Sequence, residues 1–392
     1  MKRVRCPDLS VAFGDGQSVI LRATSRGKAA RVPAFAVAVL AACGEPRSEE
    51  DVAAELGEAG RQIYQGLARA GFLVSPAEAD DTPLFFENFG AVDVHRRMLA
   101  DTARLDAYEA AIRASVGPDS AVADAGTGSG VLACLAARAG ARVVYGVDRS
   151  DLLDVASQIV KRSGLQSQVT LVRGDLRDVA LPEPVDVIVT ETFGAMALAE
   201  GSPDDVAAFA SRCLAPGGRV IPSAVQLWLA PMSDRGLLDE AFAPFAPARG
   251  VDFSPLADMA RGRGISREIP ASSLLHPGLQ IARLDYPNTP QPASRLDFGP
   301  LAPAAGRDRL TGFAGWFVLE LTDSVHLPTG PADPMTHWRQ VYFPIAEGPL
   351  LDGSPLTVEF RAAPSSDDRR SLDADLAYAL GDTTGHARFR VR

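Results

Sequence analysis

The chain has 392 residues, of which 46% are apolar and 22% are charged. This composition is typical of globular proteins and excludes disorder as the main state of the chain. The longest apolar run, residues 33–43, is too short to cross a bilayer, and no apolar stretch follows the basic N-terminus as in a signal peptide. Four scattered cysteines form no CxxC pair, so no metal site is expected. We therefore expect a cytoplasmic protein without a membrane segment.

The negative charge lies in the larger, C-terminal part of the chain. Residues 1–80 hold ten Lys/Arg and ten Asp/Glu, whereas the whole chain holds 39 and 49, which leaves 29 and 39 for residues 81–392. The entire net charge of −10 is therefore found there. Because phosphate binding depends on an excess of Lys and Arg, nucleic acid is not expected as a partner. An acidic surface favours basic or neutral substrates, although it also serves solubility.

Residues 1–75 are expected to form a small mixed domain. Strand-like pieces at 10–13, 18–22 and 28–32 are separated by GDG and SRG turns, and helices are predicted over 34–42, 48–56 and 59–70. Ser48 is a suitable N-cap, and Gly71 ends the last helix before a short strand at 72–74. This order is typical of a winged helix-turn-helix. Residues 76–83 are predicted to be a linker.

The rest of the chain divides into two regions. Residues 84–222 alternate helices with β-branched runs at 121–125, 143–148, 169–173 and 185–190, which predicts a doubly wound α/β domain with a parallel sheet. From residue 223 to 392, strand-like runs separated by Pro and Gly turns predict an antiparallel barrel or sandwich. A partly helical insertion interrupts the early part of this second region.

A glycine-rich run follows the first predicted parallel strand. Residues 122–130 read VADAGTGSG, so the strand ends near Asp124, and Gly126, Gly128 and Gly130 open the next helix. Glycines allow a ligand to approach the backbone, and Asp148 at the end of the next strand is placed to accept hydrogen bonds from ribose. Either NAD or S-adenosylmethionine could bind such a site. The G-x-G-x-G spacing departs from the dinucleotide fingerprint and favours the aminoacyl-nucleoside.

Two carboxylates follow the fourth predicted strand. Glu191 and Glu200 lie nine residues apart in the otherwise apolar loop ETFGAMALAE. A loop at the carboxyl end of a parallel strand faces the cofactor crevice. Two carboxylates there suit a planar guanidinium, which has N–H donors on two edges. The alternative is that both are solvated loop acids.

Residues 84–392 resemble the catalytic core of the protein arginine methyltransferases. The resemblance is carried by the sequence FFENF followed by HRRMLADTAR within residues 85–104, by the loop from Glu191 to Glu200, and by THW at residues 336–338. It implies a class I, Rossmann-like methyltransferase domain and an antiparallel β-barrel with an inserted dimerisation arm at about residues 233–253. It also implies S-adenosylmethionine as the cofactor, an arginine-containing substrate and a homodimer.

The resemblance implies a role for each matching residue. Arg104 would pair with the cofactor carboxylate, Glu191 and Glu200 would clamp the substrate guanidinium, and His337 would face Asp101 as a supporting dyad. The other residues expected at the cofactor are Phe86, Asp124, Gly126, Gly128, Asp148, Asp175, Leu176 and Glu191. The residues expected at the substrate, besides the two glutamates, are Met98, Phe89 and Trp338.

Several positions depart from the family pattern. Phe85 and Phe89 stand where the family has tyrosines, and Thr192 replaces the usual aromatic residue of the glutamate loop. Arg177 stands where an acid is usual, which predicts altered recognition of adenine. These changes leave open whether the product carries one methyl group or two.

The N-terminal domain has no counterpart in that family. Its order of strands and helices resembles the PqqD-like recognition elements, which capture the leader segments of ribosomally made peptides. We therefore expect a peptide substrate held by residues 1–75. A structural role for the domain remains open, as do methylation of free arginine or a guanidino metabolite and a DNA-binding regulator that senses S-adenosylmethionine. The predicted third helix carries only Arg61 and Arg69, which speaks against DNA binding.

Overall fold

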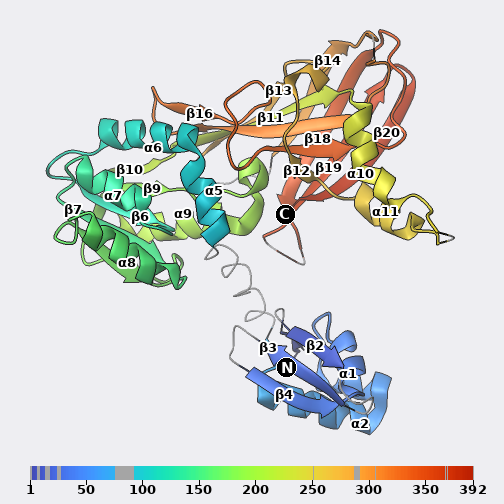
Figure 1. The fold of residues 1–392 in the computed structure, drawn as a ribbon, viewed down its shortest axis with the longest axis horizontal. Helices are drawn as coiled ribbons and strands as arrows, with labels where there is room; N and C mark the ends of the chain where they lie inside the picture. The colour runs from blue at the N-terminus through green and yellow to red at the C-terminus, as the bar shows by residue number, and fades with distance from the viewer. Residues whose placement is uncertain are drawn as a thin grey trace. The chain divides into compact units, whose positions relative to one another are not determined.

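The computed structural model describes most of the chain in two compact units, Met1–Val94 and His95–Arg392 (Figure 1). The described residues are 2–6, 9–13, 18–23, 28–75, 92–249, 251–286, 292–304, 306–366, 368 and 370–391. The predicted linker at 76–83 lies outside them. Each unit has its own buried apolar core.

The N-terminal unit contains a three-stranded antiparallel sheet and a helical layer. Its elements are β1 (Val4–Arg5), β2 (Leu9–Phe13), β3 (Ser18–Ala23), β4 (Lys28–Pro33), α1 (Ala36–Ala42), α2 (Glu49–Ala70) and β5 (Leu73–Val74). The order β2-β3-β4 leaves β3 central, and β5 pairs with β1. Helix α2 is interrupted at Gly57, whose φ of 70° is not helical, so two helical segments follow α1, as predicted. Ser48 caps α2 by accepting a hydrogen bond from the Asp51 amide at 3.1 Å. The winged-helix interpretation stays a prediction.

A five-stranded parallel sheet forms the first half of the larger unit. Four of its strands occupy the predicted residues, namely β6 (Ala121–Ala125), β7 (Val143–Asp148), β8 (Val169–Arg173) and β9 (Val185–Thr190). The fifth, β10 (Leu214–Ile221), was not predicted because Pro216 and the two glycines after it are typical of a turn. The strand order is β10-β9-β6-β7-β8, so the order reverses between β6 and β9. Loops after these strands diverge there and leave room for a ligand.

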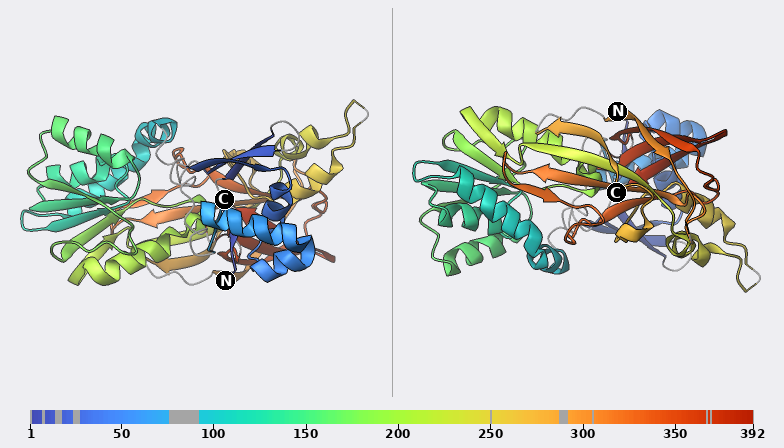
Figure 2. Two further views of the ribbon diagram at one scale, coloured as in Figure 1. Left: turned by 90° about the horizontal axis from the view of Figure 1, so that it is seen from below. Right: turned by 90° about the horizontal axis from the view of Figure 1, so that it is seen from above.

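Helices cover both faces of the parallel sheet (Figure 2). They are α6 (Thr102–Ser115), α7 (Val131–Arg138), α8 (Leu152–Arg162) and α9 (Ser202–Cys213). A further helix, α5 (Val92–Ala100), precedes α6 in the chain. Strand β6 is buried at every position, as expected for a strand covered on both sides.

Two antiparallel sheets form the second half of the larger unit. The first contains β11 (Ala224–Met232), β12 (Ile265–Arg267), β13 (Leu279–Asp285), β15 (Gly312–Glu320), β16 (His326–Pro328) and β17 (Gln340–Pro344), and the second contains β14 (Ala293–Pro300), β18 (Pro355–Pro364), β19 (Leu372–Leu380) and β20 (Thr383–Val391). The sheets pack through aromatic rings, since Phe343 lies 5.2 Å from Phe389 and 6.3 Å from Phe360 between centroids. A backbone bridge between Arg263 and Arg390 joins them at one side. The predicted barrel is therefore best described as two packed antiparallel sheets.

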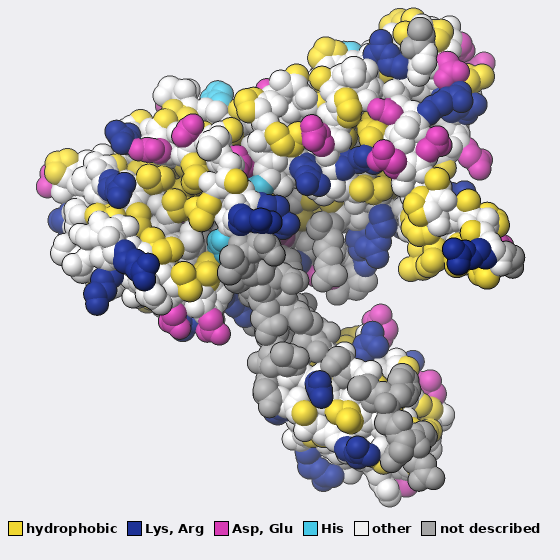
Figure 3. Space-filling view, in the orientation of Figure 1, with side chains coloured by type: hydrophobic (Ala, Val, Ile, Leu, Met, Phe, Trp, Pro, Cys, Tyr) yellow, Lys and Arg dark blue, Asp and Glu magenta, His cyan; other side chains and the backbone are white. Residues whose placement is uncertain are grey.

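A helical arm is inserted between β11 and β12. It contains α10 (Arg235–Phe242), the 3-10 turn η4 (Ala243–Phe245) and α11 (Ser254–Arg261), so it extends beyond the predicted residues 233–253. Three apolar side chains of the arm are about half exposed or more, at 51% for Val251, 48% for Leu256 and 66% for Met259. Apolar side chains gather on this arm (Figure 3). Such a patch is typical of a surface that contacts another protein.

None of the helices in the described part of the chain has the length and apolar character needed to cross a membrane. All four cysteines are buried, and no disulfide joins any of them to another. Within the described ranges, no three His, Cys, Asp or Glu side chains converge as a metal site would require.

Candidate active site

The glycine-rich turn lies at the reversal point of the parallel sheet. Gly126, Gly128 and Gly130 have φ angles of 80°, 52° and 80°, which other residues adopt only with strain. A Cβ atom on Gly126 would lie 2.3 Å from Cγ2 of Thr192, and one on Gly128 would lie 3.3 Å from Cε1 of His95. The turn therefore requires glycine both for its conformation and for the approach of its neighbours.

Asp124 and Asp148 hold the glycine-rich turn from both sides. Asp124 is buried, and its Oδ2 accepts hydrogen bonds from Thr127 Oγ1 at 2.5 Å and from the Ala133 amide at 2.9 Å. Burial raises the pKa of Asp124 to about 7, while these hydrogen bonds oppose the rise. Asp148 accepts from the Gly128 amide at 2.8 Å and from Ser150 Oγ at 2.7 Å. Both acids thus define the shape of the predicted cofactor site.

Asp175 is engaged by two arginines. Arg177 donates to it from its backbone amide at 2.9 Å and from its guanidinium at 3.0 and 2.9 Å, and Arg149 donates at 2.9 Å. The hydrogen bonds from Arg177 hold the pKa of Asp175 at about 2. The residue that departs from the family pattern therefore binds the carboxylate expected to read adenine. Leu176, between them, is partly buried and packs against the core.

A buried ion pair lies beside the glycine-rich turn. Arg104, on α6, is 1% exposed, and its guanidinium pairs with Oε2 of Glu191 at the end of β9. A second hydrogen bond joins Arg104 Nη2 to the Met98 carbonyl oxygen at 2.8 Å. The sequence predicts Arg104 only as a partner of the cofactor, so this link to Glu191 is a new feature of the site. Burial raises the pKa of Glu191, although the charge of Arg104 opposes that shift.

The residues around the turn fit a zwitterionic ligand. Arg104 Nε and Asp124 Oδ1 are buried and make no hydrogen bond within the described part of the chain. An unpaired buried donor and an unpaired buried acceptor each carry a cost of about 1–3 kcal/mol. The carboxylate and amino groups of the methionyl portion of S-adenosylmethionine offer the matching acceptor and donor.

Helix α5 covers this part of the site. His95, Met98 and Leu99 line a cavity of about 30 Å³ together with Arg104, Glu191 and the glycine-rich turn. Sites for ligands of nucleoside size are roughly 300–1,000 Å³. The cavity as described is therefore too small to hold such a ligand without a change in its lining. Phe86 and Phe89, expected at the cofactor and the substrate, lie outside the described residues.

The loop that carries both glutamates has a strained backbone. Met196, Ala197 and Glu200 have φ angles of 56°, 54° and 77°, a conformation that non-glycine residues seldom adopt. Residues in such conformations cost about 1–3 kcal/mol each and persist only where surrounding contacts impose them. The loop is therefore held in place by its neighbours.

Three contacts supply that restraint. Trp338 donates from Nε1 to the Phe193 carbonyl oxygen at 2.7 Å, and Tyr108 donates to the Thr190 carbonyl oxygen at 2.9 Å. The Glu200 amide donates to the carbonyl oxygen of Arg370, in the loop between β18 and β19, at 2.6 Å. Trp338 is itself buried, which favours a role in holding the loop over direct contact with the substrate.

Glu200 lies over Gly194 within its own loop. Burial raises the pKa of Glu200 to about 8, Glu191 adds to the rise, and Arg370 opposes it. A Cβ atom on Gly194 would lie 2.6 Å from Cγ and 2.9 Å from Oε1 of Glu200. Only glycine leaves this space for the carboxylate.

Replacement of Gly194 by Ala is expected to displace Glu200 and to lower kcat/KM at least about tenfold, because a reacting group moved by an ångström loses its alignment. The φ of Gly194 is −86°, so alanine adds no backbone strain. Steady-state kinetics and calorimetric titration with S-adenosylhomocysteine test this. Gly117→Ala, where φ is not in the left-handed region and the added Cβ would meet only Ser120 Oγ at 4.0 Å, serves as a steric control. Unchanged kinetics in Gly194→Ala would contradict the placement of Glu200.

Asp101 and His337 come together from opposite ends of the larger unit. Asp101 caps α6 by accepting from the Arg104 amide at 3.0 Å, and its Oδ2 lies 2.8 Å from the His337 amide and 2.9 Å from His337 Nδ1. Burial alone would raise the pKa of Asp101, but the hydrogen bonds from His337 and the Arg104 amide lower it. The predicted proximity of the two residues is therefore found, and it links α6 to the loop before β17.

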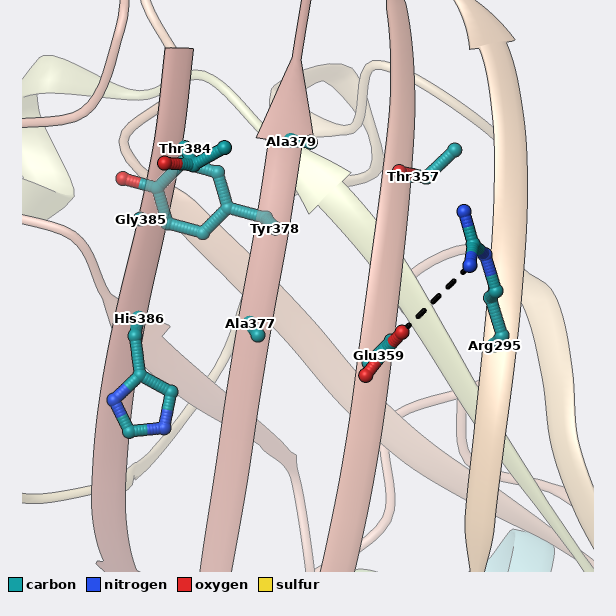
Figure 4. A pocket seen from close by; sticks show the side chains of 9 residues that line it. All are labelled: Arg295, Thr357, Glu359, Ala377, Tyr378, Ala379, Thr384, Gly385 and His386. Atoms are coloured by element: carbon teal, nitrogen blue, oxygen red, sulfur yellow. Dashed lines mark ion pairs between the residues drawn. The ribbon is translucent and has the colours of Figure 1, made fainter.

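A larger hollow of about 530 Å³ lies on the outer face of the four-stranded sheet, away from this chemistry (Figure 4). It is open to solvent, and Arg295 pairs with Glu359 across it at 3.8 Å. The Tyr378 ring covers Gly385. These features are those of a solvated sheet face, whereas the smaller cavity contains the buried ionisable groups.

Comparison with known protein families assigns the two halves of the larger unit separately. Residues 122–218 match the methyltransferase domain family. Residues 223–383 match the arginine methyltransferase oligomerization subdomain. The fold and the site thus define a methyltransferase with a C-terminal antiparallel β domain.

Individual relatives show which kind of methyltransferase the chain is similar to. The chain is 30% identical over 304 residues to protein arginine N-methyltransferase 1 of Schizosaccharomyces pombe. The aligned region covers 76% of this chain and 89% of that protein. The chain is also 30% identical over 313 residues to protein arginine N-methyltransferase 6 of Xenopus tropicalis, covering 76% and 91%. Among solved structures, protein arginine methyltransferase 10 of Arabidopsis thaliana matches with a TM-score of 0.68 and 25% identity, over 78% of this chain and 100% of that one. The chain belongs to the protein arginine N-methyltransferase family.

Proposed function

We propose that this enzyme transfers a methyl group from S-adenosylmethionine to the guanidinium of an arginine in a peptide or protein. The observation that carries the proposal is the pair of acidic side chains, Glu191 and Glu200, on one strained loop at the carboxyl end of β9. The residues of the glycine-rich turn, with Arg104, Asp148 and Asp124, would hold the cofactor. When bound, the cofactor supplies an electrophilic methyl group on a sulfonium.

The two glutamates would activate the guanidinium by localising its charge. A guanidinium is a poor nucleophile because its lone pairs are delocalised and it stays protonated. Carboxylates against two of its nitrogens draw the positive charge toward them and leave the third more nucleophilic. Arg104 engages Oε2 of Glu191, which leaves Oε1 for the substrate. The buried apolar side chains of Phe193 and Met196 in the same loop would strengthen these interactions by excluding water.

We further infer that residues 1–75 capture the leader segment of a ribosomally made precursor peptide. Strand β4 is an outer strand of the N-terminal sheet, and its burial alternates between exposed and partly buried positions. An outer strand can pair with an extended peptide, and Lys28 and Arg31 on β4 favour an acidic one. Arg61 pairs with Glu58 at 3.3 Å on α2, which leaves little basic surface there for DNA.

We also propose that two copies associate through the helical arm. The exposed apolar side chains of α11, Leu256 and Met259, would be covered in such a homodimer. The match of residues 223–383 to an oligomerization subdomain supports this.

Mass spectrometry of arginine-containing peptides incubated with the enzyme and S-adenosylmethionine tests the activity. A mass gain of about one or two methyl groups on an arginine supports the proposal. Methylation of free arginine alone, with no peptide modified, would favour the guanidino metabolite as the substrate.

Deletion of residues 1–75 is expected to raise the KM for a full-length precursor peptide at least about tenfold while sparing kcat. A remote docking site acts through an effective concentration on the order of millimolar, which the deletion removes. A short arginine-containing fragment, which has no leader, should be methylated equally well by both forms. Equal KM values for the full-length peptide with and without residues 1–75 would contradict leader capture.

A further inference from the structure

The sequence motifs do not include Arg370, yet this residue lies next to the glutamate loop. It is 3% exposed and is located in the loop that joins β18 to β19 in the antiparallel domain. Its carbonyl oxygen accepts the Glu200 amide at 2.6 Å, and its positive charge acts on the Glu200 carboxylate. A buried arginine is therefore joined through its backbone to one of the two proposed clamp residues.

The Arg370 loop is itself firmly held. Asp368 accepts from the Arg370 amide at 3.1 Å and from Ser371 Oγ at 2.7 Å. The Ser365 amide donates to the Ser371 carbonyl oxygen at 2.8 Å, and Arg390 donates to Ser365 Oγ at 2.8 Å. These hydrogen bonds hold the Arg370 backbone and the described residues beside it in the β domain.

Two neighbouring buried carboxylates resist being charged together. Glu191 has Arg104 as its counter-ion, with His337 and Asp101 nearby, whereas Glu200 is faced by Glu191 and Arg370. A substrate guanidinium would neutralise the pair once bound, but Glu200 must be ionised beforehand to attract it. A cation of the protein itself is therefore needed to stabilise the ionised form of Glu200 in the free enzyme.

We propose that Arg370 is a positioning residue that favours the charged form of Glu200 and orients it toward the incoming guanidinium. The inference rests on the proposed role of Glu200 as a guanidinium ligand. The backbone carbonyl of Arg370 fixes the left-handed conformation of Glu200, and its side chain supplies the counter-charge. A side-chain substitution leaves the backbone contact in place and so isolates the charge.

The test is the pH dependence of kcat/KM for an arginine peptide, since this quantity reports ionisation in the free enzyme. In the wild type, kcat/KM should rise with pH through about 8, where Glu200 ionises. In Arg370→Met the rise should move up by at least about one pH unit, which lowers kcat/KM about tenfold near neutral pH and restores it at high pH. Arg370→Lys, which keeps the charge, should stay close to the wild type, as should Arg388→Met, a control at an exposed arginine of β20.

The inference would be overturned if kcat/KM of Arg370→Met rose at the same pH as in the wild type. It would also be overturned if kcat/KM were lowered by the same factor at every pH. Titration with S-adenosylhomocysteine verifies that each variant is folded, and Arg370→Gln replaces the Met variant if the latter fails this check. If both of these variants fail the check, Arg370→Leu, a third neutral variant, is tested against the same expected shift of at least about one pH unit. The Glu200→Gln variant separates the proposed guanidinium clamp from the proposed role of Arg370. Full activity in Glu200→Gln refutes the guanidinium clamp. If Glu200→Gln is inactive but kcat/KM of Arg370→Met rises at the same pH as in the wild type, only the role of Arg370 is refuted.

Discussion

Replacement of Glu200 by Gln is expected to lower kcat/KM for an arginine peptide about 10- to 100-fold while leaving cofactor affinity unchanged. Gln is nearly isosteric with Glu but removes the charge that opposes the guanidinium. A hydrogen bond to a charged group contributes about 1.5–3 kcal/mol, and its loss at the reacting group appears in the transition state. Steady-state kinetics with calorimetric titration of S-adenosylhomocysteine measure both quantities.

Glu359→Gln is a suitable control for this substitution. Glu359 lies on the outer face of the four-stranded sheet with a half-exposed side chain, so removing its charge should change neither quantity. Retention of full activity in Glu200→Gln would exclude the arginine clamp. Glu191→Gln is less selective, because Glu191 also forms the buried pair with Arg104.

Arg104→Ala is expected to weaken cofactor binding at least about tenfold and to lower the free energy of unfolding by about 3–5 kcal/mol. The first effect follows from the loss of the partner of the cofactor carboxylate. The second follows because Glu191 would remain buried without its counter-ion. Calorimetric titration measures the affinity, and denaturant unfolding measures the stability.

The same helix offers a matched control. Arg113, two to three turns along α6, is 70% exposed and pairs with Glu109 on the surface, where an ion pair contributes little. Arg113→Ala should therefore leave both the affinity and the stability nearly unchanged. Wild-type affinity in a folded Arg104→Ala variant would mean that the cofactor is oriented differently.

Local patterns were sufficient to predict the parallel sheet and the separate motifs. The apolar runs of β6, β7 and β9 coincide with the observed strands because a strand buried on both faces is largely apolar along its length. The edge strand β8 was predicted as well, although it is only partly buried. By contrast, β10 contains Pro216 and Gly217, and these residues predict a turn when only their neighbours in the sequence are considered. The strand pairs with β9 at Leu214 and again at residues 219–221, and its register shifts across Pro216 and Gly217, which form an irregularity within the strand.

The parts of the site that were missed depend on contacts between distant segments. Arg370 lies 170 residues beyond Glu200 and belongs to no motif, so only the folded chain reveals their proximity. The pairing of Arg104 with Glu191 also joins distant segments of the chain. It was not predicted, because the sequence assigned Arg104 to the cofactor and Glu191 to the substrate and the cofactor. Arg177 was recognised as a departure, but its hydrogen bonds to Asp175 required coordinates.

The strained glutamate loop couples the two halves of the larger unit. Its conformation is imposed from the antiparallel domain, through the Trp338 indole and the Arg370 carbonyl, although the loop itself follows a strand of the parallel sheet. The shape of the proposed substrate site therefore depends on residues of both halves, although its two glutamates belong to one loop. Catalytic competence is thus expected of the assembled unit and not of the parallel-sheet half by itself.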